Sequence, residues 1–219
     1  KEMDYPNLFS FSYGLKNNFE AKTAKKVSDK IGVPWVFIEP NLKNSLKFYN
    51  SKIRKSYEYY SNNFCSVPSY LDFEAFNSLR NLNNFSEDAI IINGQTGDFI
   101  SGNHLPPDLI GKQGDLENLV EIIYEKNFNL WNELKNNLNK DLILKNIKKN
   151  IISLGEKNNC SLYEYWEWKE RQSKYVVNSQ RVYDFYGYEW FLPFWEKNFL
   201  DFWKKVPYEL KLNQDLYTS

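Results

Sequence analysis

A short run of β-branched residues followed directly by a glycine-punctuated polar loop constrains this chain more than any other stretch. Residues 90–92 are all isoleucine, too few for a helix, and they predict a strand that is buried on both faces, as in parallel sheets. The loop at residues 93–107 places amide, hydroxyl and carboxylate side chains between its glycines. Glycine permits close backbone approach, and open α/β sheets bind ligands beyond the carboxyl ends of their strands. The stretch therefore predicts a ligand site, with a surface loop whose glycines serve only its turns as the alternative.

The composition narrows the classes of function. The 28 basic and 28 acidic residues cancel, so the chain shows no electrostatic footprint for nucleic acid or for an anionic membrane. No apolar run approaches the length that spans a bilayer. Cys65 and Cys160 lack metal-ligand spacing, which indicates free thiols and a cytoplasmic protein. Aromatic residues make up 18% of the chain, and we expect core packing, with stacking platforms for a sugar or nucleotide as the alternative.

Strand and helix signals alternate in the first half of the chain. Residues 8–13 and 34–38 predict two strands, and Asn17 with Glu20 predicts the start of a helix that ends at Gly32. Helical spacing follows over residues 42–60 and 68–82, before the strand at residues 88–93. This order predicts parallel strands joined by helices.

Beyond residue 107 only helical periodicity recurs, over residues 116–124, 142–154 and 162–177. Ser161 and Glu164 form a capping-box pattern at the start of the last stretch. We therefore predict an α/β fold with a Rossmann-like parallel sheet of strands 8–13, 35–38 and 89–93 in residues 1–110. A C-terminal helical half, residues 111–219, follows it.

Two segments resemble the signature motifs of asparagine synthase-type domains. Residues 94–102, GQTGDFISG, resemble G-x-G-x-D-E-x-x-G-G, and residues 180–196, QRVYDFYGYEWFLPFWE, resemble D-R-x-x-M-x-x-G-x-E-x-R-x-P-F-L-D. Phe99 stands where the family has glutamate, and Thr96 and Asn103 stand where it has glycine. The matches fall at Gly94, Asp98 and Gly102 in the first segment and at Arg181, Gly187, Glu189, Pro193 and Phe194 in the second.

The resemblance implies an ATP-pyrophosphatase (HUP) type of domain that activates a carboxylate as its acyl-adenylate and lets an amine displace AMP. It implies Arg181 and Glu189 as catalytic residues, for which a structural ion pair is the alternative. It also implies Asp98 as a ligand of Mg²⁺, which needs only one or two protein carboxylates beside phosphate. His104, the single histidine, lies at the rim of the loop, and its role is left open. The implied ATP-binding residues are Gly94, Gln95, Thr96, Gly97, Asp98 and Gly102.

The family's phosphate-cradling S-G-G-x-D-S loop does not occur in these residues, and Lys1 is not an initiator methionine. We therefore expect a piece of a longer protein that alone neither binds ATP tightly nor forms AMP. The implied partners are ATP, a small-molecule carboxylate and a glutaminase domain or subunit. Three hypotheses remain: an amide ligase, a relative that amidates a carboxylated sugar or another acceptor, and a non-catalytic binding domain.

Overall fold

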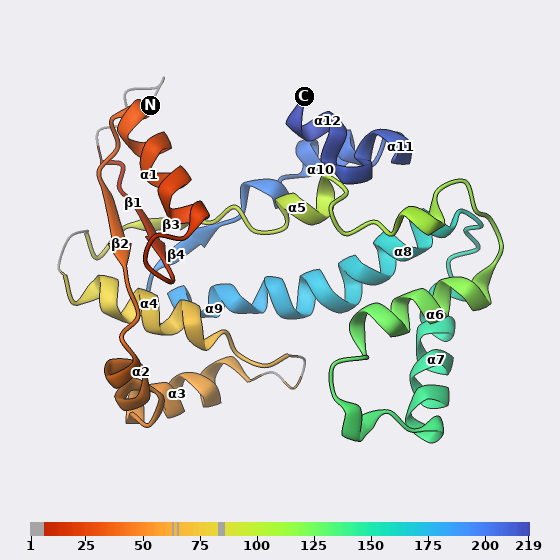
Figure 1. The fold of residues 1–219 in the computed structure, drawn as a ribbon, viewed down its shortest axis with the longest axis horizontal. Helices are drawn as coiled ribbons and strands as arrows, with labels where there is room; N and C mark the ends of the chain where they lie inside the picture. Colours follow the sequence, from red (N-terminus) through yellow and green to blue (C-terminus); the bar gives the residue numbers. More distant parts are fainter. Residues whose placement is uncertain (1–6, 63, 65, 83–85) are drawn as a thin grey trace. The chain divides into compact units, whose positions relative to one another are not determined.

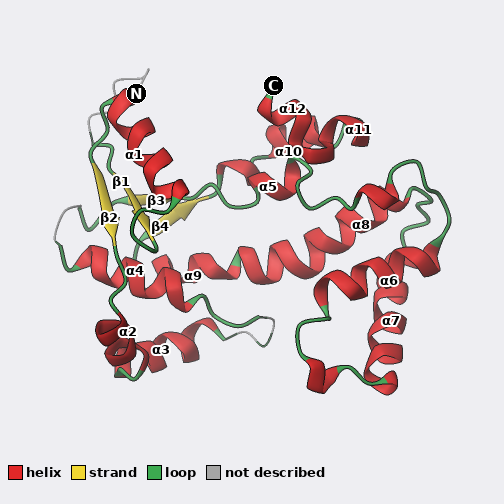
Figure 2. Cartoon of the chain, in the orientation of Figure 1, coloured by secondary structure: helices red, strands yellow, loops and turns green. Residues whose placement is uncertain are grey.

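The computed structural model describes residues 7–62, 64, 66–82 and 86–219 and is mainly helical (Figures 1 and 2). The chain divides into two compact units. Unit 1 comprises Lys1–Ile91 and Asn178–Phe191, and unit 2 comprises Ile92–Val177 and Leu192–Ser219. Each unit therefore combines segments from both halves of the sequence. The division into a nucleotide-binding part, residues 1–110, and a helical part, residues 111–219, stays a prediction.

Unit 1 begins with a β-α-β segment. β1 (Ser10–Tyr13) and β2 (Trp35–Ile38) pair in parallel, with Ser10 opposite Trp35, and α1 (Phe19–Ile31) connects them. Parallel neighbours need such a crossover, so the predicted first strand, helix and second strand are confirmed.

The ends of α1 show how local chemistry sets its length. Asn18 caps the helix by accepting a hydrogen bond from the backbone N–H of Ala21 at 2.7 Å. Gly32 ends it with a left-handed φ of 66°. The predicted end is confirmed, whereas the predicted cap at Asn17 is wrong by one residue.

Helices make up most of the rest of unit 1. The predicted helix over residues 42–60 is divided, because Ser51 starts a new helix by accepting a hydrogen bond from the Arg54 N–H at 3.2 Å. The helix predicted over residues 68–82 begins after Ser69, close to its predicted start at Pro68. The helices are α2 (Leu42–Tyr49), α3 (Lys52–Ser61), α4 (Tyr70–Arg80) and α9 (Arg181–Phe185).

The core of unit 1 is built largely from aromatic rings. Phe73 on α4 is fully buried and stacks on Tyr57, with ring centroids 4.1 Å apart, and on Tyr186, at 5.5 Å. These contacts join α4 to segments before and after it in the sequence. The high aromatic content is therefore used here for packing, as expected. The buried members of this core are Tyr57, Phe73, Phe76, Leu79, Ile91, Val182, Tyr183 and Tyr188.

The predicted Rossmann-like parallel sheet is wrong. β3 (Ile90–Ile92) pairs with β4 (Glu189–Phe191) in a separate two-stranded sheet, and in the described part of the chain neither strand joins β1 and β2. Ile91 is buried, but Ile90 and Ile92 are 58% and 65% exposed. Side chains alternate along a strand, so one face of the isoleucine triplet points to the core and the other does not. The prediction that this strand is buried on both faces is therefore wrong. The fold is therefore helical with two small sheets.

Unit 2 is a helical assembly. Asn158 starts α8 by accepting a hydrogen bond from the Ser161 N–H at 3.2 Å, so the predicted cap at Ser161 is wrong. α8 continues directly into a π-helix, Trp168–Val176, which we call the π-helix. The α-helices are α5 (Gly97–Ile100), α6 (Leu116–Asn127), α7 (Asn137–Ile152), α8 (Asn159–Glu167), α10 (Lys197–Trp203), α11 (Tyr208–Lys211) and α12 (Asp215–Thr218). Single 3₁₀ turns occur at Pro107–Leu109, Asn132–Leu134, Pro193–Trp195 and Leu212–Gln214.

Two apolar clusters stabilise unit 2. The larger one packs α6, α7 and α8 together, with Ile123, Ile151 and Tyr163 fully buried. The smaller one contains Phe99 from α5 and Trp203 from α10. Phe99, which aligns with a glutamate in the motif that residues 94–102 resemble, is a buried residue of this cluster.

Two expectations from composition can be compared with the structure. Cys160 is a free, buried cysteine, and burial raises the pKa of its thiol to about 11. The expectation for Cys65 concerns a residue outside those that the structure describes. No helix in the described ranges has the length and apolar character to cross a bilayer.

We expect Phe73→Ala to lower the free energy of unfolding by about 3–5 kcal/mol, because it removes a fully buried ring from the aromatic core of unit 1. Phe19→Ala is the control, since Phe19 is 82% exposed and its loss should change stability by less than about 0.5 kcal/mol. Urea denaturation followed by circular dichroism measures both. Equal effects of the two substitutions would contradict this account of the core.

Candidate functional site

The predicted loop turns sharply between β3 and α5. Thr96 adopts a left-handed conformation with φ of 77°, the conformation that glycine adopts most readily, and it occupies a position that is glycine in the motif that this loop resembles. Gly102 has a φ of 101°, and a Cβ atom there would overlap the carbonyl group of Lys211. Two positions that are glycine in the family motif thus have positive φ angles in this chain.

Part of the second signature packs on this loop within unit 2. A Cβ atom added to Gly97 would lie 2.8 Å from the Phe194 ring, so only glycine allows this approach. The indole N–H of Trp195 donates a hydrogen bond to Thr96 Oγ1 at 3.0 Å. The next residue, Glu196, caps α10 by accepting from the Asn198 N–H at 2.7 Å.

The two predicted catalytic residues lie in unit 1, and the loop lies in unit 2. Arg181 places its guanidinium 4.5 Å from the centroid of the Tyr60 ring, a cation–π contact. Glu189 is exposed on β4. No ion pair joins Arg181 to Glu189 among the described residues, so the structural alternative for this pair is not seen. Their catalytic role stays a prediction.

Asp98, His104, Glu167 and Arg171 form a continuous row of charged groups in unit 2, which we call the histidine cluster. His104 Nε2 lies 2.9 Å from Asp98 Oδ2, and its Nδ1 lies 2.6 Å from Glu167 Oε1. Arg171 Nη1 donates to the same Glu167 oxygen at 3.0 Å. Both ring nitrogens therefore face carboxylate oxygens, an arrangement that suits the doubly protonated imidazolium.

Glu167 is the inner member of the histidine cluster, with its side chain 0% exposed. Its Oε2 accepts from the Tyr163 hydroxyl at 3.0 Å, and Gln172 Nε2 lies 3.4 Å from Oε1. Tyr163 in turn accepts from Lys126 Nζ at 2.7 Å. Because the π-helix starts immediately after Glu167, its wider turn holds both Arg171 and Gln172 against the same carboxylate.

The charges in the histidine cluster shift one another's pKa values. Burial lowers the pKa of His104, but hydrogen bonds to Asp98 and Glu167 outweigh burial and raise it above the ordinary 6.5. The hydrogen bond from His104 lowers the pKa of Asp98. Burial raises the pKa of Glu167, yet the hydrogen bond and the positive charge of His104, with that of Arg171, bring it below the usual value. The pKa shifts favour the ionised form of all three groups.

Asp98 is the one group of the histidine cluster that presents a carboxylate to solvent, with its side chain 54% exposed. Its Oδ1 accepts from the Phe99 N–H at 2.8 Å and its Oδ2 from His104, which leaves lone pairs on both oxygens. Across the described ranges there is no group of three or more His, Cys, Asp or Glu residues that could hold a metal ion. Asp98 therefore fits Mg²⁺ only as a single protein ligand beside phosphate oxygens and water.

The sequence alone points to Asp98 and His104 but not to Glu167, the buried residue at the centre of the histidine cluster. His104 and Asp98 were singled out in the sequence, whereas Glu167 was not recognised as the partner of His104. Glu167 and Arg171 are spaced i, i+4, the spacing of helical ion pairs, and this was the available signal. No local pattern places that pair beside His104, which lies 63 residues earlier.

Comparisons with known proteins add no identification. No model of a protein family matches the chain, and no curated protein matches it in sequence.

We expect His104 to titrate above its ordinary pKa of 6.5, because two carboxylates accept hydrogen bonds from its imidazolium. The chain has a single histidine, so proton NMR of its Cε1–H signal reads this pKa directly. Glu167→Gln should lower the measured pKa. Glu170→Gln, which removes a carboxylate paired with Lys174, is the control and should leave it unchanged. A wild-type pKa at or below 6.5 would contradict the described cluster.

We expect Gly102→Ala to destabilise the chain by about 1–3 kcal/mol more than Gly111→Ala. Both glycines have positive φ angles, 101° and 73°, so both substitutions carry backbone strain. Only at Gly102 does the added methyl group meet backbone atoms, and nothing lies within 4 Å of a Cβ at Gly111. Thermal unfolding of the two variants measures the difference, and equal losses would show that the Lys211 approach is not close.

Proposed function

We propose that this chain contributes to an ATP-dependent, AMP-forming amide ligase of the asparagine synthase type, which activates a small-molecule carboxylate as its acyl-adenylate. In such an enzyme an amine, from ammonia or from a glutaminase partner, then displaces AMP. The proposal concerns the residues of the two signatures, and it does not depend on a doubly wound sheet.

The contact between the two signature segments carries this proposal. Phe194 from the second segment lies against Gly97 of the first, and Trp195 hydrogen-bonds Thr96. These segments are about a hundred residues apart in sequence, and their meeting supports a shared role. The positive φ angles at Thr96 and Gly102 support it further, because these positions are glycine in the family motif.

Asp98 is the residue best placed to act on a nucleotide. The histidine cluster keeps it ionised and fixes one of its oxygens, while half of the side chain is open to solvent. The positive charge of Arg171 acts on the Asp98 carboxylate, and Lys126 donates to the carbonyl oxygen of His104, the residue that pairs with Asp98. These positive charges oppose a free cation and favour phosphate. Asp98 would therefore hold Mg²⁺ only when the metal arrives with ATP, and the metal would neutralise phosphate charge there.

The remaining roles follow from positioning. Phe99, which stands where the motif has glutamate, has no carboxylate for proton transfer, and its ring is buried in an apolar cluster. Activation would thus depend on orientation and electrostatics rather than on a general base at this position. Arg181 and Glu189 are proposed as further catalytic groups from the resemblance alone.

We expect Asp98→Asn in the full-length protein to reduce carboxylate-dependent exchange of pyrophosphate into ATP by about 10²–10³-fold, because it removes a charge that acts at the phosphates. The assay uses a panel of carboxylates that includes aspartate and carboxylated sugars. Asp108→Asn is the matched control, since Asp108 is exposed and lies outside the histidine cluster.

Three results bear against the proposal. Exchange that is unchanged by Asp98→Asn would remove Asp98 from the reaction. Full-length protein that exchanges pyrophosphate with none of the carboxylates would favour a non-catalytic binding domain. Formation of AMP and pyrophosphate by these 219 residues alone would contradict the expectation that the phosphate-cradling loop is needed.

A further inference from the structure

One face of α7 in unit 2 presents large apolar side chains to solvent. Leu138 and Leu142 are 70% and 52% exposed, and their i, i+4 spacing puts them on one side of the helix. Leu134 is 60% exposed, and its carbonyl oxygen accepts from Asn139 Nδ2 at 2.9 Å, which ties it to the start of α7. We call Leu134, Leu138 and Leu142 the leucine row. Single exposed leucines are ordinary, but a continuous group marks an interaction surface.

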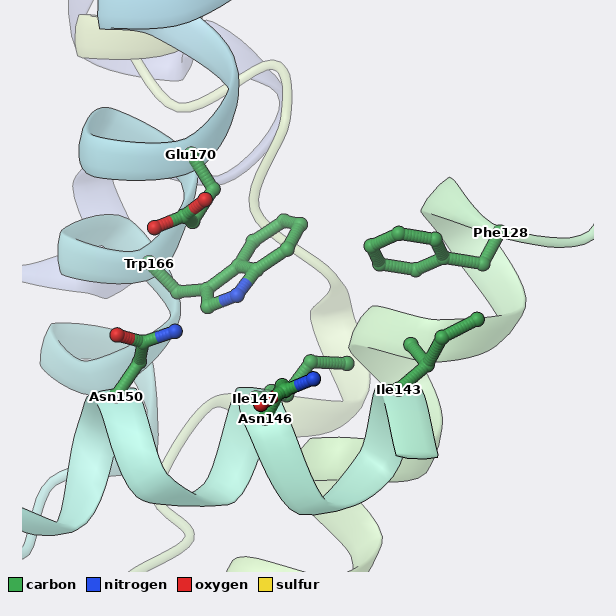
Figure 3. Close-up of a pocket in the computed structure, with 7 residues that line it drawn as sticks. All are labelled: Phe128, Ile143, Asn146, Ile147, Asn150, Trp166 and Glu170. Carbon is green, nitrogen blue, oxygen red and sulfur yellow. The ribbon is translucent and has the colours of Figure 1, made fainter. Parts of the chain in front are cut away.

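The leucine row leads into a hollow beside α7 (Figure 3). Asn146 and Asn150 line the hollow, and they continue the i, i+4 spacing of the row along the helix. Ile147 and Trp166 form its inner walls and belong to the larger core cluster of unit 2, so these walls are fixed. The volume is about 150 Å³, which holds one benzene-sized group such as a leucine side chain.

The charges on this face differ between its two ends. Glu133, Lys135 and Asp141 are exposed along the leucine row, and together they leave a net charge of −1. Lys145 and Lys149 are exposed beside the hollow and carry two positive charges. None of these five side chains forms an ion pair with a described residue, so their charges are available to a partner. The lysines of α7 that pair with glutamates of α6 are Lys140 and Lys148.

We propose that a second copy of this chain docks on this face and forms a two-fold symmetric dimer. Two antiparallel α7 helices can pair with Leu138 of each copy opposite Leu142 of the other. Leu134 then lies opposite Asn146 at the rim of the hollow, because each of these residues is one further turn from the centre. One leucine side chain from each copy enters the hollow of the other, and Glu133 approaches the lysines there.

Shape and charge together select a second copy as the occupant. One end of the face has a projecting leucine and excess negative charge, and the other end has a leucine-sized hollow and positive charge. A two-fold axis brings the unlike ends together twice, because the same surface serves both partners. The face is therefore complementary to itself.

A membrane surface matches this face less well. Glu133 and Asp141 are exposed among the leucines, so they would meet the phosphates of an anionic bilayer. A bilayer also makes no use of a hollow that holds a single side chain.

The test is the oligomeric state of the chain, measured by sedimentation equilibrium without ATP, so it does not depend on the proposed ligase activity. We expect a monomer–dimer equilibrium with a dissociation constant of roughly 1–100 µM. Leu138→Ala should raise this constant at least about 10-fold, because the contact loses its central residue in both copies. Leu134→Ala should raise it too. Leu42→Ala is the matched control, since Leu42 is 78% exposed on α2, and it should leave the constant unchanged.

Charge reversal tests how the two copies are oriented. Glu133→Lys in one variant, and Lys145→Glu with Lys149→Glu in another, should each weaken self-association at least about 10-fold, because like charges then face each other. An equimolar mixture of the two variants should restore the dimer, since opposite charges again meet at both ends.

The control for charge reversal is Lys43→Glu with Lys47→Glu, a pair of exposed lysines with the same spacing on α2. This variant should dimerise like the wild type. Circular dichroism verifies that each variant is folded.

The proposal is overturned if the chain stays monomeric throughout this concentration range. It is also overturned if Leu42→Ala weakens a dimer more than folded Leu138→Ala and Leu134→Ala do, or if the mixed charge variants do not associate. Binding to phosphatidylserine vesicles that Leu138→Ala abolishes, with no dimer in solution, would assign the face to a membrane instead.

Discussion

Unit 2 depends on the pairing of one buried carboxylate. Glu167 is fully excluded from solvent, and an unpaired charge in that position would cost several kcal/mol. His104, Arg171 and Tyr163 each contact its oxygens. These partners come from the loop after α5, from the π-helix and from α8, so loss of the carboxylate would disturb all three segments. Two consecutive side chains of the π-helix, Arg171 and Gln172, reach this one carboxylate.

This pairing also connects the two signature segments to the helical core. Trp195 donates to Thr96, Thr96 donates to Gln172 Oε1 at 3.1 Å, and Gln172 reaches Glu167. A row of hydrogen bonds thus runs from the second signature through the first to the buried carboxylate. On its other side Glu167 fixes His104, which holds Asp98 at the surface. Asp98, the residue proposed to act on ATP through Mg²⁺, therefore takes its orientation indirectly from Glu167, which is itself buried.

The sequence predicted local structure better than tertiary pairing. Gly32 ended a helix where expected, because a left-handed cap is a local requirement of glycine. The strand at residues 90–92 was found, but its partner β4 lies about a hundred residues away, and three isoleucines do not encode that choice. His104 was noticed as a lone histidine, whereas its pairing with Glu167 depends on packing between distant segments. The short strands and the glycine at a helix end follow from neighbouring residues, whereas the two predicted N-caps fell one and three residues from the observed ones. Ion pairs between elements do not follow from neighbouring residues.

The dependence of stability on pH tests the central role of Glu167 most directly. Because the folded-state pKa of His104 is raised, its pairing stabilises unit 2 fully below about pH 6.5, and this contribution is lost as pH rises through the folded pKa. Free energies of unfolding should be measured from urea titrations between about pH 6 and 9 by tryptophan fluorescence, for the wild type and for Glu167→Gln. The account predicts that wild-type stability falls over this range and that the fall is smaller in Glu167→Gln. Equal pH dependence in the two proteins would contradict it.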